Sequence, residues 1–238
     1  MGKTKRYNDK LRSLIDTFYN NESVASDLDA LNISRLEPLP SLIDESSIDI
    51  CVLGMNPSHS EKGYRSIGLD SLDDIFTYQG PGFFNEKLER LIDIQKVFYA
   101  KYPYFKQIKS FIESISKSSS IAFLDFLPIR HTDQKAIEKL IDLQPEATMS
   151  LVNHTVDYLV ELKPKLILVL NARGSRLIRD VLERSTEFKI LQIVPAGDHV
   201  TSKSTSLTIL YSGMITGAGG MDTFSRERLA HQISMFLK

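Results

Sequence analysis

Short apolar runs alternate along the chain with segments in which apolar residues recur at helical spacing. Three of the runs, Ile48 to Leu53, Ile121 to Leu127 and Leu166 to Leu170, are rich in residues suited to a strand buried on both faces. Leu207 to Tyr211 predicts the last strand, and Lys189 to Val194 predicts an extra one. Apolar strands without polar alternation are typical of a parallel sheet.

Helical patterns precede, separate and follow these strands. Leu11, Leu14, Ile15 and Phe18 predict a first amphipathic helix. Further helices are predicted around Phe84 to Ile92, Phe105 to Ile112, Met149 to Val160, Arg173 to Leu182 and Leu229 to Leu237. Because strands and helices alternate, we expect a three-layer α/β/α fold with a central, mainly parallel sheet and right-handed crossovers.

The chain of 238 residues shows no repeat, low-complexity segment or long linker. We therefore expect one α/β domain over residues 1–238. Within it, residues 1–46 form an N-terminal helix and lead-in loop, and residues 47–238 form the core.

Composition narrows the function classes. The 29 Lys and Arg residues nearly balance the 30 Asp and Glu residues, so contact with a nucleic acid must come from a local basic surface. The single cysteine, Cys51, excludes an intrachain disulfide, a Cys-rich zinc site and a four-cysteine iron-sulfur cluster. No apolar run approaches the roughly 18 residues of a membrane helix, and the first residues lack a signal sequence. We expect a soluble, unprocessed, cytoplasmic monomer that needs no cofactor and binds no membrane.

Polar or glycine-rich segments follow four of the predicted strands. They are GMNPS from Gly54, DFLPIR from Asp125, NARGS from Asn171 and SGMIT from Ser212. Ligands of open parallel sheets bind beyond the carboxyl ends of the strands, so these segments are the candidate site.

The strand followed by GMNPS resembles the first motif of the uracil-DNA glycosylase superfamily, whose single-strand-selective and mismatch-specific branches carry Gly-x-Asn-Pro there. Three later segments resemble the superfamily in the same order: YQGPGFFNEKLERL, FLDFLPIR and LILVLNARGSRLI. The resemblance runs from Ile48 to the end of the chain. It implies a glycosylase-like fold, DNA as the partner, and base-excision repair by hydrolysis of the N-glycosidic bond of a flipped-out damaged or deaminated base.

Two positions depart from the superfamily pattern. The last motif usually begins with His or Asn followed by Pro and Ser, whereas Ser212 and Gly213 follow the last strand here. Asp125 stands where the base-reading residue is usually Asn. These departures put the substrate base in question.

The resemblance implies roles for individual side chains. Asn56 would be catalytic and would orient a water, because an amide is no general base near neutral pH. Met55, Phe76, Tyr78 and Asp125 would contact the base, with an aromatic ring stacked on it.

DNA contacts are expected at a wedge and at two arginines. Bulky apolar residues beside glycines suit insertion into the base stack, and arginines suit phosphate contact. The wedge comprises Ser212, Gly213, Met214 and Ile215 within the segment that runs to Gly220, and the arginines are Arg130 and Arg173. Asn56, Asp125 and Ser212 are expected to converge on one cleft. No pair of histidines has metal-ligand spacing, so no metal site is expected.

Each assignment has a structural alternative. GMNPS can be a plain strand-to-loop turn, Phe76 and Tyr78 can be core residues, and Asp125 can cap a helix or pair with Arg130. For the whole chain, one alternative is a catalytically inactive nucleic-acid or nucleotide-binding protein on the same fold. Another is an unrelated hydrolase on a doubly wound sheet.

Overall fold

The computed structural model describes residues 2–43, 47–57, 60–69, 73–80, 83–184, 189–194, 197–202, 205–215 and 220–237. The chain divides into two compact units, between which it passes several times. Unit 1 comprises Met1–Leu42, Asn56–Tyr102 and Leu127–Asp157, and unit 2 comprises Ile43–Met55, Pro103–Phe126 and Tyr158–Lys238. The expectation of a single domain stays a prediction.

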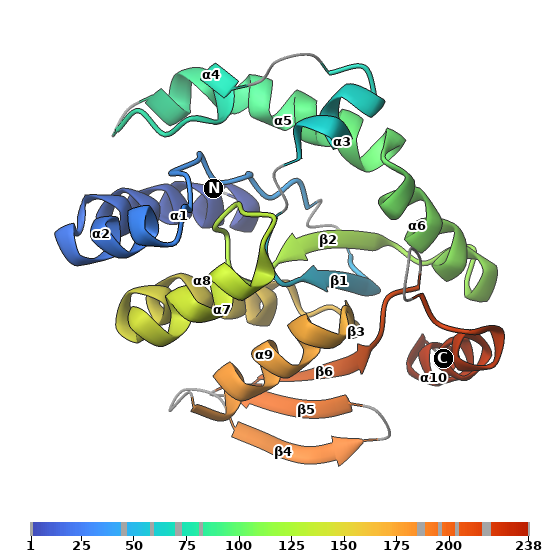
Figure 1. The fold of residues 1–238 in the computed structure, drawn as a ribbon. Helices are drawn as coiled ribbons and strands as arrows, with labels where there is room; N and C mark the ends of the chain where they lie inside the picture. The colour runs from blue at the N-terminus through green and yellow to red at the C-terminus, as the bar shows by residue number, and fades with distance from the viewer. Residues whose placement is uncertain are drawn as a thin grey trace. The chain divides into compact units, whose positions relative to one another are not determined.

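Unit 2 contains a six-stranded sheet with the order β2-β1-β3-β6-β5-β4 (Figure 1). The strands are β1 (Ile50–Gly54), β2 (Ile121–Asp125), β3 (Leu166–Leu170), β4 (Lys189–Val194), β5 (Gly197–Ser202) and β6 (Thr205–Ser212). Strands β2, β1, β3 and β6 pair in parallel, whereas β5 runs antiparallel to both β6 and β4. The expected mainly parallel sheet is confirmed.

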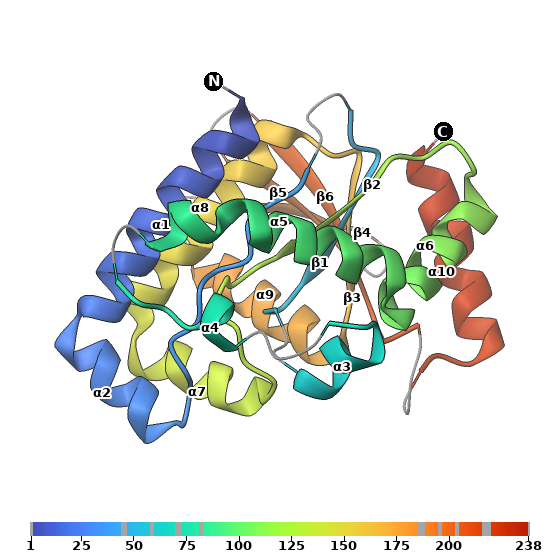
Figure 2. The same ribbon diagram turned by 90° about the horizontal axis from the view of Figure 1, so that it is seen from above.

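Helices cover both faces of this sheet. On one face, α6 (Pro103–Ile115) and α10 (Thr223–Leu237) lie side by side, as Figure 2 shows, and on the other α9 (Ala172–Arg184) contacts β3, β4 and β6. The first face buries Ile50, Val52, Ile108, Ile112, Leu166, Leu168, Leu170, Leu210, Ile215, Leu229 and Ile233 in one cluster. Unit 2 therefore has the three-layer α/β/α fold expected from the alternating pattern.

The parallel register decides which strand-end residues share a face. Val52 of β1 and Leu210 of β6 belong to the cluster beneath α6 and α10. Side chains alternate along a strand, so Gly54 and Ser212, each two residues later, lie on the same face. Asp125 pairs with Gly54 and lies on that face too.

Unit 1 is mainly helical among its described residues. Its helices are α1 (Lys3–Asn20), α2 (Glu22–Ala30), α3 (Glu61–Ser66), α4 (Asp73–Phe76), α5 (Phe83–Lys101) and α7 (Gln134–Leu143). Helix α8 (Pro145–Leu162) begins in unit 1 and ends in unit 2. The predicted first helix is confirmed, and it buries Leu11, Ile15 and Phe18. None of the described helices is long and apolar enough to cross a membrane.

Candidate functional site

Asp125 and Gly54 lie side by side at the carboxyl ends of β2 and β1. A Cβ added at Gly54 would collide with the Oδ1 atom of Asp125. The amide of Phe126 donates to the Gly54 carbonyl at 2.9 Å, which extends the pairing beyond β2. The missing side chain of Gly54 therefore leaves room for the neighbouring carboxylate.

Tyr104, which no motif in the sequence indicated, lies near Asp125. Burial, followed by the negative charge of Asp125, raises the pKa of the Tyr104 phenol to about 12. Its ring meets Phe105 edge-on at 5.2 Å, and Phe105 meets Phe123 edge-on at 4.9 Å. The available signal was the aromatic cluster YPYF at the start of a predicted helix.

Helix α9 follows β3 directly, and Asn171 caps its first turn. Asn171 accepts hydrogen bonds at Oδ1 from the amides of Arg173, at 3.0 Å, and Gly174, at 2.9 Å. A Cβ on Gly174 would lie 3.3 Å from Cβ of Met55, so α9 packs closely on this residue. Met55 is 2 % exposed, which corrects its predicted role as a base contact: its side chain packs in the interior. Arg173 is half-buried, and its phosphate contact stays a prediction.

Ser212 ends β6 and connects to the predicted wedge. Its Oγ donates to Sδ of Met221 at 3.4 Å, and Met221 donates its amide to the Met214 carbonyl at 2.8 Å. Gly213 and Met214 are half-buried, but Ile215 is only 4 % exposed and belongs to the core cluster. Ile215 is thus wrong as a wedge residue, because insertion into DNA would remove it from this core. Residues 216–219 of the segment lie outside the described residues.

Asp125 and Ser212 share one face and one edge but do not adjoin. Two strands, β1 and β3, separate β2 from β6. Three strand spacings of about 4.8 Å place the two residues about 14 Å apart. One base cannot contact both, although a longer nucleic-acid segment can.

Asn56 lies in unit 1, where its amide is anchored by main-chain carbonyls. Its Nδ2 donates to the carbonyls of His131, at 2.7 Å, and Ile129, at 3.1 Å. Carbonyls only accept, so these bonds fix which end of the amide is nitrogen and leave Oδ1 as an oriented acceptor. The His131 amide returns a 3.0 Å bond to the Pro57 carbonyl. Burial lowers the pKa of the His131 imidazole, only partly offset by Asp133, so it is neutral at pH 7.

Arg130 and Phe76 are buried together in unit 1. Both side chains are fully buried. The guanidinium carbon of Arg130 lies 3.8 Å from the Phe76 ring centroid, and Nη2 donates to the Tyr64 hydroxyl at 2.5 Å. The predicted roles of Arg130 at DNA phosphates and of Phe76 under a base are therefore wrong for this structure. The guanidinium of Arg130 thus lies against the Phe76 ring in a cation-π contact.

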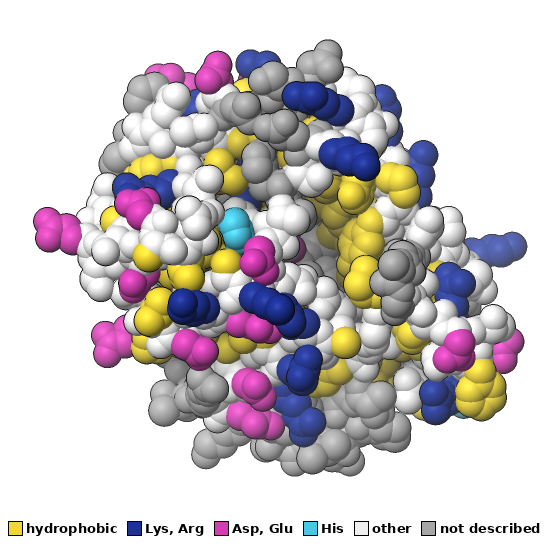
Figure 3. Space-filling model, viewed as in Figure 1, with side chains coloured by type: hydrophobic (Ala, Val, Ile, Leu, Met, Phe, Trp, Pro, Cys, Tyr) yellow, Lys and Arg dark blue, Asp and Glu magenta, His cyan; other side chains and the backbone are white. Residues whose placement is uncertain are grey.

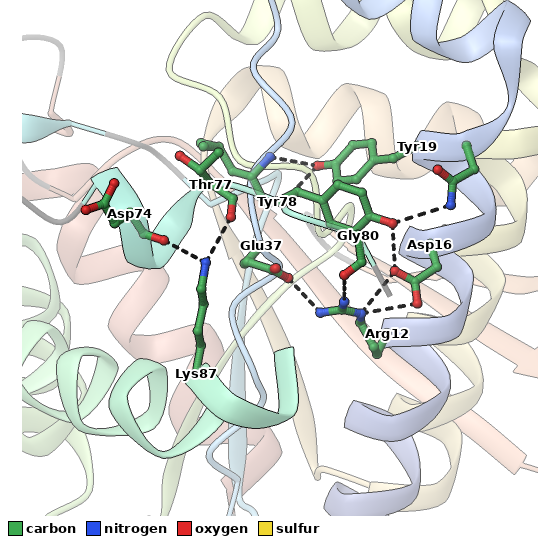
Figure 4. Close-up of polar contacts among 11 residues, drawn as sticks. Arg12, Asp16, Tyr19, Glu37, Asp74, Thr77, Tyr78, Gly80 and Lys87 are labelled. Carbon is green, nitrogen blue, oxygen red and sulfur yellow. Dashed lines mark hydrogen bonds and ion pairs between the residues drawn. The ribbon is translucent and has the colours of Figure 1, made fainter. Parts of the chain in front are cut away.

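Tyr78 belongs to a polar network around α1, shown in Figure 4. Its hydroxyl donates to Asp16 at 2.8 Å, and its ring meets Tyr19 edge-on at 4.9 Å. Burial, and then Asp16, raise the pKa of Tyr78 to about 12. Arg12 bridges Asp16 at 3.1 Å and Glu37 at 2.8 Å. Tyr78 is half-buried, so stacking on a base stays a prediction.

No group of three or more His, Cys, Asp or Glu residues suited to a metal ion occurs in the described part of the chain. No protein-family model matches the chain, and no curated protein matches it either. The resemblance to the uracil-DNA glycosylase superfamily therefore stays a prediction that rests on the four sequence segments named above.

Proposed function

We propose that this protein is a divergent DNA glycosylase that hydrolyses the N-glycosidic bond of a flipped-out damaged or deaminated base. The observation that carries the proposal is the anchored amide of Asn56, whose nitrogen is held by the carbonyls of Ile129 and His131. The remaining Oδ1 is an acceptor of fixed direction, which suits it to hold a water.

In the proposed reaction the bond from the sugar C1′ to the base nitrogen breaks first, and its electron pair leaves with the base. The water oxygen then bonds to C1′, and the proton that the water loses neutralises the base anion that has left. Asn56 orients this water and takes no proton, because an amide does not act as a base near neutral pH. The rate then depends on positioning, for which misplacement by about 1 Å can cost about 100-fold.

Asp125 is proposed to read the base. An ionised carboxylate only accepts hydrogen bonds, so it favours a base that presents an exocyclic amine, as cytosine does, over uracil, whose O4 needs a donor. Uracil also leaves as an anion, and a carboxylate about 4 Å away would oppose that charge by about 4 kcal/mol at an effective dielectric constant of 20. This corresponds to roughly three orders of magnitude in rate.

The same carboxylate favours a second candidate function, binding of a nucleic acid or nucleotide without cleavage. Asp125 ends β2, and its carboxylate would oppose the negative charge of a base that leaves as an anion, which slows cleavage but not binding. In this second candidate the site recognises an amine-bearing base and never breaks its bond to the sugar.

An excision assay separates these candidates. Single-stranded and duplex oligonucleotides would carry uracil, mismatched thymine, hypoxanthine, xanthine or cytosine, and base release and DNA binding would be measured on the same samples. We expect Asn56→Ala to lower excision about 100-fold while binding persists. The control is Asn20→Ala, because Asn20 is exposed and has one long bond, of 3.5 Å, to Tyr78.

Asp125→Asn should raise activity on uracil. Efficient release of uracil by the wild type at pH 8, unchanged by Asp125→Asn, would show that the role assigned to Asp125 is wrong. Release that survives Asn56→Ala would reject the role of Asn56. Binding without release from any oligonucleotide would favour the second candidate.

A further inference from the structure

A groove on the outer side of unit 2 lies between α6 and α10. It has a volume of about 410 Å³ and is lined by Lys106, Gln107, Ser110, Phe111 and Ser114 of α6 and by Arg226 of α10. Lys106, Ser110 and Ser114 recur every four residues and form one stripe along α6. At 1.5 Å per residue, this stripe is about 12 Å long, which exceeds the size of one phosphate group.

Two cationic side chains, Lys106 and Arg226, line the groove. Within the described part of the chain, neither Lys106 nor Arg226 forms a side-chain hydrogen bond or ion pair. The neighbouring cations do have partners. Lys109 forms an ion pair with Glu113 at 3.8 Å, and the guanidinium of Arg228 lies 5.2 Å from the Phe224 ring centroid. An unpaired lysine and arginine from two different helices therefore face a space that no acidic side chain lines.

The surroundings of the groove are basic, although the chain as a whole is not. Residues 103–117 carry three lysines and one glutamate, and residues 220–237 are neutral, with Arg226 and Arg228 against Asp222 and Glu227. These two segments of unit 2 thus carry a net charge of +2 in a chain whose net charge is -1. Figure 3 shows Lys and Arg side chains over α6. Such local charge attracts a polyanion even when the whole protein is nearly neutral.

The lining residues match the chemistry of a nucleic-acid strand. Lysine, arginine, serine and glutamine are the side chains that contact phosphates and sugars, and an aromatic ring offers a surface on which a base can stack. Phe111 supplies such a ring, because it is only half-buried. The volume lies in the range that holds one small organic ligand, and the length of the stripe allows a second phosphate to bind.

We propose that the α6/α10 groove binds single-stranded nucleic acid, with Lys106 and Arg226 on successive phosphates and Phe111 against a base. The groove is built from residues other than those assigned to base excision, so the proposal does not depend on glycosylase activity. It adds a second contact for DNA on unit 2 and predicts binding to undamaged strands.

Fluorescence anisotropy tests the groove. The probe is an end-labelled oligothymidylate of twelve nucleotides, and binding is measured over a range of NaCl concentrations. The variant is Lys106→Glu with Arg226→Glu. The matched control is Lys135→Glu with Lys139→Glu on α7, which changes the net charge by the same amount at two exposed lysines. Thermal unfolding of each variant would verify the fold, and Lys106→Gln with Arg226→Gln would repeat the test without adding negative charge.

We expect the groove variant to weaken binding at least tenfold, the Gln variant to weaken it less, and the control to change it less than twofold. Loss of two phosphate contacts should also make the slope of log K against log salt shallower by about 1.4. Equal weakening in groove and control variants, or no weakening in either, would overturn the proposal. Tighter binding of duplex DNA, or equal competition by thymidine monophosphate, would also overturn it, in favour of a duplex or mononucleotide site. Base excision measured in parallel reports on the proposed function alone.

Discussion

The ion pair between Arg12 and Glu37 allows a sharp prediction about the stability of unit 1. The Glu37 side chain is fully buried, and its Oε2 accepts a 2.8 Å bond from Arg12, while Oε1 has no hydrogen bond among the described residues. Burial raises the pKa of Glu37, and Arg12 is the largest opposing influence. The charge of Glu37 is therefore tolerated in the interior mainly because Arg12 lies beside it.

Arg12→Met keeps most of the aliphatic stem but removes the cation. The buried carboxylate then has no positive charge beside it, and the free energy of unfolding should fall by about 4 kcal/mol. Glu37→Gln should cost only about 1 kcal/mol, because Arg12 retains Asp16 at 3.1 Å and the Gly80 carbonyl at 2.6 Å. Adding Glu37→Gln to Arg12→Met should recover part of the lost stability, since it removes the unpaired charge.

Urea unfolding of the wild type, both single variants and the double variant at pH 5 and pH 7 would measure these differences. In Arg12→Met the folded state holds the Glu37 proton to a higher pH than the unfolded state, whose pKa is about 4.3. Stability of this variant should therefore fall as pH rises from 5 to 7, by up to about 1.4 kcal/mol per pH unit. A double variant no more stable than Arg12→Met, or a pH-independent loss, would refute the reasoning.

Three further predictions concern unit 2. Gly54→Ala should cost about 1–3 kcal/mol because its Cβ collides with Asp125, and Asp125→Ala in the same chain should restore part of this loss in urea unfolding. The hydrogen bond from Lys165, at 2.8 Å, lowers the pKa of Asp49, so Asp49→Asn should lower the free energy of unfolding at pH 7, by up to about 1 kcal/mol because Lys165 is mostly exposed. That cost should shrink as acid titration below about pH 4 protonates the wild-type carboxyl. Burial raises the pKa of Cys51 to about 12, from an ordinary value of about 8.5, so thiol labelling should be at least about 1000-fold slower in the native protein than in urea.

The sequence predicts well those strands that consist of a continuous run of apolar residues. Leu166 to Leu170 matches β3 residue for residue, and the run Ile48 to Leu53 covers β1 except for its last residue, Gly54. By contrast, β5 (Gly197–Ser202) was not predicted, because its sequence GDHVTS is mostly polar. It is a strand because it pairs on both sides with β4 and β6, an arrangement that depends on residues outside the segment.

The sequence indicates where residues of the candidate site lie along the strands better than it indicates which side chains they contact. That Gly54 and Asp125 follow parallel strands could be inferred from the sequence, and their direct pairing is found in the structure. The burial of Arg130 could not be inferred, because a loop arginine is usually exposed and its partners Tyr64 and Phe76 are more than 50 residues away in sequence. Long-range packing of this kind leaves no local periodicity.

The last prediction concerns the aromatic partner of a base at Asp125. Phe76 is excluded by its burial under Arg130, whereas Tyr104 lies in the same unit as Asp125 and is close enough for that carboxylate to raise its pKa. Tyr104 is only half-buried, so its ring retains exposed surface on which a base can stack. Stacking typically contributes about 1–3 kcal/mol per base, so Tyr104→Leu should weaken binding of the preferred lesion strand between about fivefold and 150-fold. Tyr104→Phe keeps the ring and should bind nearly as the wild type does in the same anisotropy titration. If both variants bind as tightly as the wild type, no base stacks on Tyr104. If both lose the same amount of affinity, the phenol hydroxyl, and not the ring, makes the contact.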